Sequence, residues 1–177
     1  ALLLKRLGSK KQIYGFDSFQ GFPSYSKYDE LSCYDDIELD SKLRNRISVL
    51  HEIRSQDHAE ILDPSNISAS TNFSDTSKDS VLRRIDYLEL DNITLVEGDF
   101  ADTVPDFFQK YDKQIFSANI DCDLYDGYIE SLNFIWKYSK SGTYIHLDEY
   151  YSLKFPGAKI ATDEFLKNKK NNVINHI

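Results

Sequence analysis

The sequence predicts an α/β protein built on a mostly parallel sheet with helices on both faces. Four strand-like segments each end at an acidic residue, and amphipathic segments separate them. This alternation is typical of right-handed crossovers, which place the C-terminal ends of parallel strands on one edge of the sheet. Open α/β sheets bind ligands at that edge. The predicted strands are Ile13–Asp17, Ile93–Asp99, Ile115–Asp121 and Thr143–Glu149.

The length and charge of the chain limit its class. A chain of 177 residues with 41% hydrophobic content predicts one globular domain, spanning 1–177. The net charge of -8 and the lack of a Lys/Arg run argue against a nucleic acid as partner. We find no signal peptide and no apolar run long enough to cross a bilayer, which predicts a soluble, cytoplasmic protein without a membrane partner. Two distant cysteines, Cys33 and Cys122, fit a reducing compartment.

Both ends of the chain indicate a partial domain. Ala1–Leu7 followed by Gly8 is typical of the last turns of a helix with a glycine cap, and no initiator methionine is present. Asn172–Ile177 has the pattern of a strand that is cut short. We therefore expect a fragment, or a chain that has lost its first strand and glycine-rich turn.

Residues 24–75 form a predicted insertion in this domain. The part through Asp40 is acidic and tyrosine-rich, Leu43–Ile61 has helical spacing, and Pro64–Ser80 has loop composition. Long insertions at a ligand-binding edge often serve as lids or substrate-binding segments. Ordinary variable surface is an equally open interpretation.

The other helices are predicted from their caps and apolar faces. Ser77 is predicted to cap one helix, and Thr103 to cap another that has Pro105 in its first turn. A helix is expected after Gly127, with Gly142 marking its end, and a final helix over Pro156–Lys169.

Asp121 and Asp148 are candidate metal ligands. They stand 27 positions apart (148 minus 121), which is one strand-helix-strand unit. Adjacent strands are about 4.8 Å apart, and carboxylates that close repel unless they share a cation or a proton. With Glu149 as a third oxygen ligand, the pattern predicts Mg²⁺ or a similar divalent cation. The alternative is that lysines such as Lys154 or Lys159 neutralise the cluster.

A second group of residues predicts a nucleoside site. Asp17, followed by Ser18, ends a strand where an acidic residue can accept hydrogen bonds from ribose hydroxyls. At the next strand tip, Gly98 and Asp99 would let the backbone approach an adenine, and Phe100 offers an apolar face.

Five ordered blocks of sequence resemble the macrocin O-methyltransferase (TylF/MycF-like) family. They span most of the chain outside the insertion: Tyr14–Pro23, Leu95–Pro105, Ile120–Tyr125, Gly142–Tyr150 and Pro156–Phe165. The resemblance implies a Rossmann-like class I methyltransferase fold, truncated at both termini. It also implies an enzyme that uses S-adenosylmethionine and Mg²⁺ to methylate a hydroxyl of a sugar or other polyol natural product.

Carried over by position, the resemblance implies that Asp121, Asp148 and Glu149 hold the metal. The predicted contacts of the cofactor are the residues of the nucleoside site: Asp17, Ser18, Gly98, Asp99 and Phe100. The family usually has aspartate where this chain has Glu149, which puts the metal geometry in question. The family's glycine-rich loop would precede Ala1, so this chain alone is expected to bind cofactor poorly and to be inactive.

Catalysis is then expected to run through the metal on Asp121, with the general base unassigned. We interpret His146 as a core histidine rather than a base. The expected partner is a small-molecule hydroxyl acceptor, and a homo-oligomer is left open.

Two other functions stay open. Asp121-Cys122-Asp123 matches the short Asp-x-Asp signature of metal-dependent glycosyltransferases, which bind a nucleotide sugar. A phosphatase of the Asp-x-Asp type fits less well, because its nucleophile follows the first strand of the domain. A non-catalytic, methyltransferase-like binding module is the second alternative, and the upstream sequence would distinguish it from the enzyme.

Overall fold

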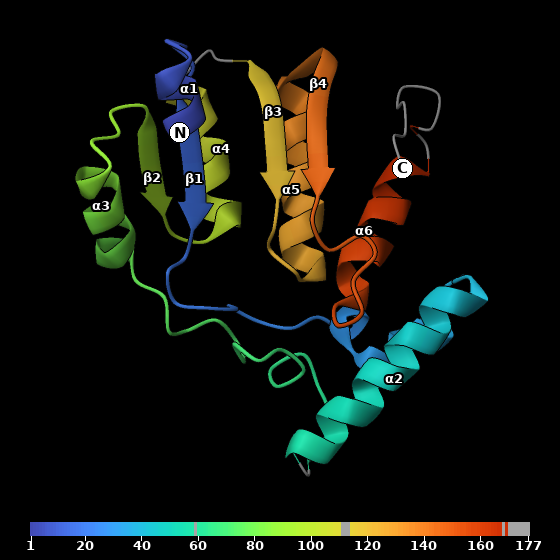
Figure 1. Ribbon diagram of the computed structural model, residues 1–177. Helices are drawn as coiled ribbons and strands as arrows, with labels where there is room; N and C mark the ends of the chain where they lie inside the picture. The colour runs from blue at the N-terminus through green and yellow to red at the C-terminus, as the bar shows by residue number, and fades with distance from the viewer. Residues whose placement is uncertain (59, 111–113, 168, 170–177) are drawn as a thin grey trace. The chain divides into compact units, whose positions relative to one another are not determined.

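The computed structural model describes residues 1–58, 60–110, 114–167 and 169. The chain divides into two compact units, which are described separately (Figure 1). Unit 1 comprises Ala1–Pro23 and Phe73–Asp112, and unit 2 comprises Ser24–Asn72 and Lys113–Ile177.

Unit 1 is built on a parallel pair of strands, β1 (Ile13–Asp17) and β2 (Ile93–Glu97). Both strands were predicted, although β2 ends two residues early. The pairing places Asp17 beside Glu97 at their C-terminal ends. The helices of this unit are α1 (Leu2–Arg6), α3 (Lys78–Tyr87) and α4 (Phe100–Lys110). Phe107 of α4 packs edge-on against Phe16 of β1, with ring centroids 5.3 Å apart.

The helix caps of unit 1 confirm one prediction and correct another. Ser77 caps α3 by accepting a hydrogen bond from the backbone N–H of Ser80. Thr103 was predicted to cap α4, but this helix begins three residues earlier, at Phe100. Asp99 takes the capping role, because its Oδ1 accepts from the N–H of Ala101 at 2.8 Å. Pro105 consequently lies inside the helix rather than in its first turn.

Unit 2 contains the second parallel pair, β3 (Ile115–Ile120) and β4 (Ser139–Leu147). The prediction that Gly142 ends the preceding helix is wrong. That helix, α5 (Tyr125–Tyr138), ends earlier, and Gly142 lies within β4 at a φ of 92°. The register of the pair shifts between Ile115 and Ser117, so Gly142 accommodates an irregular stretch of strand, which is a usual role of glycine in sheets.

The core of unit 2 lies where α5 and α6 (Pro156–Leu166) pack against the sheet. In Figure 1, α5 runs behind β3 and β4. Each helix buries residues at spacings of three and four, which is the repeat of one helical face. These faces include the buried Tyr128, Leu132 and Ile135 on α5, and Ala158, Ala161 and Phe165 on α6. The alanines let the two helices approach closely.

Most of the predicted insertion, Ser24–Asn72, belongs to unit 2. It contains two short 3-10 helices, η1 (Lys27–Asp29) and η2 (Leu31–Asp35), and the long helix α2 (Ser41–His58). The helix predicted over Leu43–Ile61 is therefore confirmed in type. Both 3-10 helices contact α6, and Tyr34 donates a hydrogen bond to the carbonyl of Ser152 at 3.1 Å.

Two further predictions concern the ends of the chain and the membrane. The final helix ends at Leu166, before the predicted Lys169. The strand predicted over Asn172–Ile177 lies outside the described residues. Within the described part of the chain, no helix combines the length and apolar character needed to span a bilayer.

The core assignment predicts unequal costs for two leucine truncations. Leu132 is 3% exposed and Leu3 is 68% exposed. Leu132→Ala should lower the free energy of unfolding by about 2–5 kcal/mol, because it leaves a cavity between α5 and the sheet. Leu3→Ala, as a matched control, should change it by less than about 0.5 kcal/mol. Denaturant unfolding followed by circular dichroism measures both, and equal costs would contradict this core.

Candidate functional site

Asp121 and Asp148 follow the C-terminal ends of two adjacent strands. β3 ends at Ile120 and β4 at Leu147, and these residues pair in the parallel register. The backbone N–H of Asp148 donates to the carbonyl of Ile120 at 3.0 Å, so the pairing continues past the strand end. The structure therefore places these two carboxylates side by side, as the sequence predicted.

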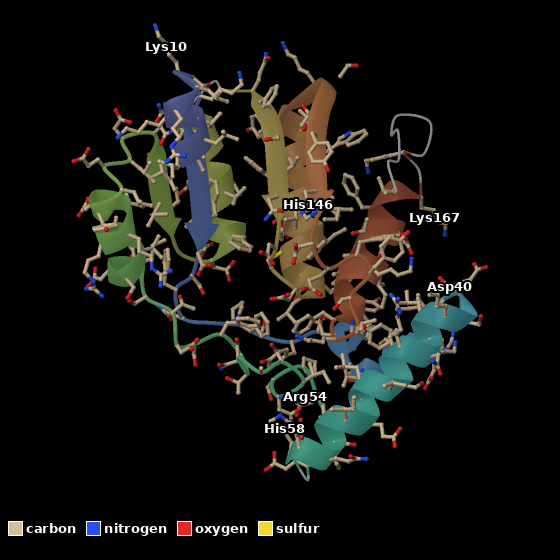
Figure 2. The ribbon with its side chains drawn as sticks, viewed as in Figure 1. Lys10, Asp40, Arg54, His58, His146 and Lys167 are labelled. Atoms are coloured by element: carbon tan, nitrogen blue, oxygen red, sulfur yellow. The ribbon has the colours of Figure 1, made fainter. Side chains whose placement is uncertain are left out.

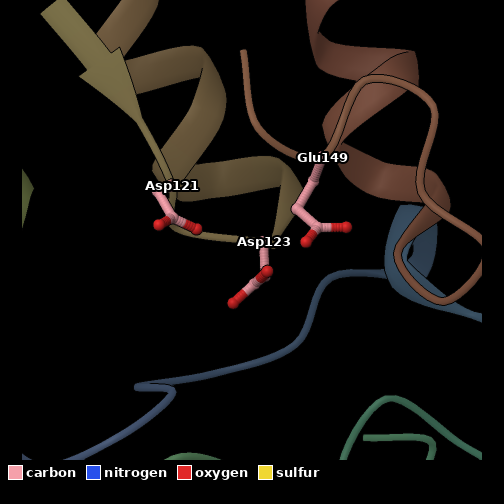
Figure 3. A group of neighbouring side chains, drawn as sticks. All are labelled: Asp121, Asp123 and Glu149. Atoms are coloured by element: carbon pink, nitrogen blue, oxygen red, sulfur yellow. The ribbon is translucent and has the colours of Figure 1, made fainter. Parts of the chain in front are cut away.

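Four carboxyl groups gather at this strand edge. Asp121, Asp123 and Glu149 each contribute an oxygen, and these oxygens lie within 4.8 Å of one another. Figure 3 shows the three side chains turned toward a common space. The side chain of Asp148 lies within hydrogen-bonding reach of Asp121, and the side chain of Glu149 lies within hydrogen-bonding reach of Asp123. The predicted ligand set omitted Asp123, whose place in the cluster depends on the turn that follows β3.

Asp123 is held in a tight and uncommon turn. The N–H of Leu124 donates to the carbonyl of Cys122 at 2.6 Å, and the intervening Asp123 has a φ of 61°. Residues other than glycine rarely adopt this backbone conformation, although aspartate adopts it more readily than most. Such strain persists where surrounding structure over-determines it, often at functional sites. The turn directs Asp123, only 8% exposed, toward Glu149.

Tyr128 fixes the backbone beneath the carboxylates. Its side chain is fully buried. The hydroxyl accepts a hydrogen bond from the N–H of Glu149 at 2.8 Å and donates to the carbonyl of Ile120 at 3.2 Å. It thereby ties Glu149, the second residue after β4, to the end of β3. Sequence reasoning missed this role, because helical spacing marks Tyr128 only as a core position.

The electrostatics of the cluster favour uptake of positive charge. Burial, and then the charges of Asp148 and Glu149, raise the pKa of Asp121. Burial, and then the charges of Glu149, Asp121 and Asp148, raise the pKa of Asp123 to about 7. The neighbouring carboxylates therefore make the ionisation of Asp121 and Asp123 less favourable, an effect that a bound cation would reverse.

None of the described ion pairs joins a lysine or arginine to this cluster, and the nearby His146 lowers the pKa of Asp121 less than burial and the neighbouring carboxylates raise it. Lys159, the alternative from the sequence, pairs with Asp163 at 2.8 Å and donates to the hydroxyl of Tyr150. The other described ion pairs join Arg54 to Asp57 and Lys78 to Glu97. Lys154 forms none of these pairs, so the lysine interpretation finds no support.

His146 is exposed, contrary to its interpretation as a core histidine. It lies on β4 (Figure 2), and by alternation it faces away from Ile145 and Leu147, which are partly buried against the core. The alternation of β4 therefore directs it away from α5 and the core. Its Nδ1 forms a hydrogen bond with Oδ1 of Asn119 at 2.6 Å, across the strand pair.

The predicted nucleoside residues belong to unit 1, where β1 and β2 bring their strand tips together. Oδ1 of Asp17 accepts from the N–H of Phe19 at 2.6 Å, and the N–H of Gly98 donates to the carbonyl of Asp17 at 3.0 Å. Gly98 has a φ of 137°, which strongly favours glycine. Ser18 donates to the carbonyl of Gly21. Asp99 is exposed and Phe100 begins α4, so their predicted cofactor contacts stay predictions.

Solved structures with the same fold define the class of this protein. The chain superposes on a crystal structure of CalS11, a calicheamicin methyltransferase, with a TM-score of 0.58 and 24% identity over 88% of this chain. It superposes on the O-methyltransferase NovP with a TM-score of 0.58 and 19% identity over 95% of this chain. The alignments cover 52% and 57% of those chains, so this chain spans about half their length. The fold is the Rossmann-like fold of class I methyltransferases.

The sequence itself identifies the family. Residues 56–177, more than half of the chain, match the macrocin-O-methyltransferase (TylF) family. The chain therefore belongs to this family, and four of the five resembling blocks, all except Tyr14–Pro23, lie within the matched residues. No curated protein matches the chain in sequence.

The raised pKa of Asp123 predicts a pH-dependent stability in the absence of metal. Its pKa is about 7 in the folded state and about 3.9 when unfolded. At a pH between these two pKa values, the folded state binds more protons than the unfolded state. The free energy of unfolding therefore falls as the pH rises through this range. With a chelator present, we expect a loss of roughly 1–4 kcal/mol from pH 5 to pH 7.5. Asp123→Asn should flatten this dependence in chemical denaturation, and an equally steep slope in the variant would contradict the assignment.

Removal of the Tyr128 hydroxyl should destabilise the protein. Tyr128→Phe leaves the N–H of Glu149 without its partner, and we expect a cost of about 1–3 kcal/mol. Tyr138→Phe, on the same helix, is the matched control and should cost less. Thermal unfolding measures both, and similar losses in the two variants would argue against the bridging role.

Proposed function

We propose that this chain carries the metal site of an S-adenosylmethionine-dependent O-methyltransferase that acts on a hydroxyl group of a sugar or related polyol. The observation that carries the proposal is the convergence of four carboxyl groups at the ends of β3 and β4, where none of the described ion pairs joins them to a lysine or arginine. Family membership supports the methyl transfer, because the family name specifies an oxygen acceptor.

In this proposal, Asp121, Asp148 and Glu149 hold a divalent cation such as Mg²⁺, which prefers carboxylate oxygens. Asp123 lies beside them and adds negative charge. The longer side chain of Glu149 reaches the common space, so its difference from the family's aspartate does not remove it from the cluster. A cation held there would lower the pKa of a substrate hydroxyl and orient its oxygen toward the methyl group of the cofactor.

The cofactor half of the proposal rests on unit 1. Asp17, Ser18, Gly98, Asp99 and Phe100 would contact the nucleoside of S-adenosylmethionine. The close backbone approach of Gly98 to Asp17 supports this placement. A small-molecule acceptor is the proposed partner, and the name of the neighbour CalS11, a calicheamicin methyltransferase, agrees with a natural product. The glycosyltransferase alternative depends on the spacing of Asp121 and Asp123 alone, and the family match gives it no support.

The proposal predicts that Asp121 is needed for metal-dependent turnover. In the protein expressed from the complete reading frame, Asp121→Asn should reduce Mg²⁺-dependent methyl transfer by at least roughly a hundredfold, equivalent to about 2.7 kcal/mol of barrier. The fold should survive, because Asp121 is exposed. Asp126→Asn, an exposed acid in the first turn of α5, is the matched control and should retain activity.

Radiolabelled methyl transfer to a polyol panel and calorimetric titration of S-adenosylmethionine provide the readouts. Unchanged turnover in Asp121→Asn would contradict the metal assignment. A folded wild-type protein that bound a nucleotide sugar and no S-adenosylmethionine would favour the glycosyltransferase. Binding of neither would favour the non-catalytic module.

A further inference from the structure

Asp29 is a buried carboxylate that the proposed function does not use. It ends η1 in the segment predicted as an insertion, and it is 1% exposed. It accepts hydrogen bonds from the backbone N–H and the hydroxyl of Ser26, at 2.8 and 2.9 Å. It also accepts from the N–H of Tyr125 at 2.7 Å, a residue 96 positions away. A buried acid with three donors from two distant segments indicates a defined structural task.

That task is to cap α5. Tyr125 is the first residue of this helix, and the residue at the N-cap position, Leu124, provides no side-chain hydrogen bond. The first N–H groups of a helix lack partners within the helix, and a nearby carboxylate satisfies them and interacts favourably with the helix dipole. The nearest acid before the helix, Asp123, turns toward Glu149 instead. Asp123 is therefore part of the carboxylate cluster and does not cap α5. Asp29, which is distant in sequence, caps this helix instead.

The first turn of α6 completes the surroundings of Asp29. A Cβ placed on Gly157 would overlap Oδ1 of Asp29 and would come within 2.8 Å of the nitrogen of Tyr125. Only glycine fits at this approach. The ring of Tyr28, next to Asp29, packs on the ring of Tyr125 with centroids 4.4 Å apart. Three elements, η1, α5 and α6, therefore meet around one carboxylate.

We propose that Asp29 is a positioning residue of the carboxylate cluster, which holds the start of α5 and thereby the Asp121–Asp123 turn. The inference rests on the proposed function, since it concerns the geometry of the same metal site. Asp123 lies two residues before Tyr125 in a strained turn among repelling charges. Such a turn needs a fixed anchor, and the Asp29 contact is adjacent to it. The first part of the insertion is accordingly a component of the site and not variable surface.

Substitution of Asp29 tests this role through metal affinity. In Asp29→Ala, the dissociation constant for Mn²⁺, measured by water proton relaxation, should rise roughly tenfold or more, as for other residues that orient metal ligands. Asp29→Asn keeps one acceptor oxygen for Tyr125 and should recover part of this loss. Asp36→Ala, an exposed acid in the same segment, is the matched control and should bind Mn²⁺ as the wild type does. Unchanged affinity in folded Asp29→Ala would overturn the proposal.

Gly157→Ala, a substitution in α6, tests the same contact. Alone, its methyl group should displace the Asp29 carboxylate and weaken Mn²⁺ binding. In the Asp29→Ala background the carboxylate is gone, so the added methyl should cost less, and the two changes should be non-additive. Independent, multiplicative losses would overturn the account.

Hydrogen exchange separates this proposal from the proposed function. If the wild-type protein bound no Mn²⁺, the proposed function would fail, and the amides at 125–128 would decide the role of Asp29. Faster exchange there in Asp29→Ala than in Asp36→Ala would support the anchor. Equal exchange would overturn it.

Discussion

The parallel pairing of β3 with β4 is the constraint on which the candidate site depends. Its register sets Ile120 beside Leu147. The residues that follow, Asp121 and Asp148, are therefore brought together by backbone hydrogen bonds rather than by attraction between their side chains. The sheet forces together like charges that would separate in a flexible chain. Burial first, and then this repulsion, raise the pKa values of Asp121 and Asp123.

The surrounding contacts hold this unfavourable arrangement in place. Tyr128 links the backbone of Glu149 to the end of β3, and Asp29 binds the first N–H of α5. The N-terminus of α5 directly follows the acidic turn and favours negative charge there. Both contacts act on the backbone and leave the carboxylate oxygens of Asp121 and Glu149 available. The local rigidity and the excess negative charge together make the cluster suited to a divalent cation.

The sequence predicted those features that depend on local pattern. Apolar runs that end in an acidic residue identified the four strands of the described residues, and the spacing of Asp121 and Asp148 placed them on adjacent strand ends. Predictions were wrong where a residue that is typical of a helix end has a different place in the structure. Thr103 is a good cap, but Asp99 lies closer to the start of α4 and takes the role. Gly142 resembles a helix end, but it serves the irregular stretch of β4.

Long-range contacts were beyond prediction from one sequence. Nothing local distinguishes Asp29 from the other acids of its segment, because its partner lies 96 positions away. Asp123 was not among the predicted ligands, and its place in the cluster depends on a turn with positive φ that local sequence patterns do not reveal. His146 is exposed between the partly buried Ile145 and Leu147, and the sequence does not reveal which face of β4 is covered.

The most direct test of the central claim is a crystal structure of the complete protein with Mn²⁺, recorded at a wavelength where manganese scatters anomalously. The account predicts an anomalous peak bonded to a carboxylate oxygen of Asp121 and to Asp148 or Glu149, at about the 2.0–2.2 Å typical of small divalent cations. A peak that does not touch Asp121, or no peak at saturating Mn²⁺, would contradict it.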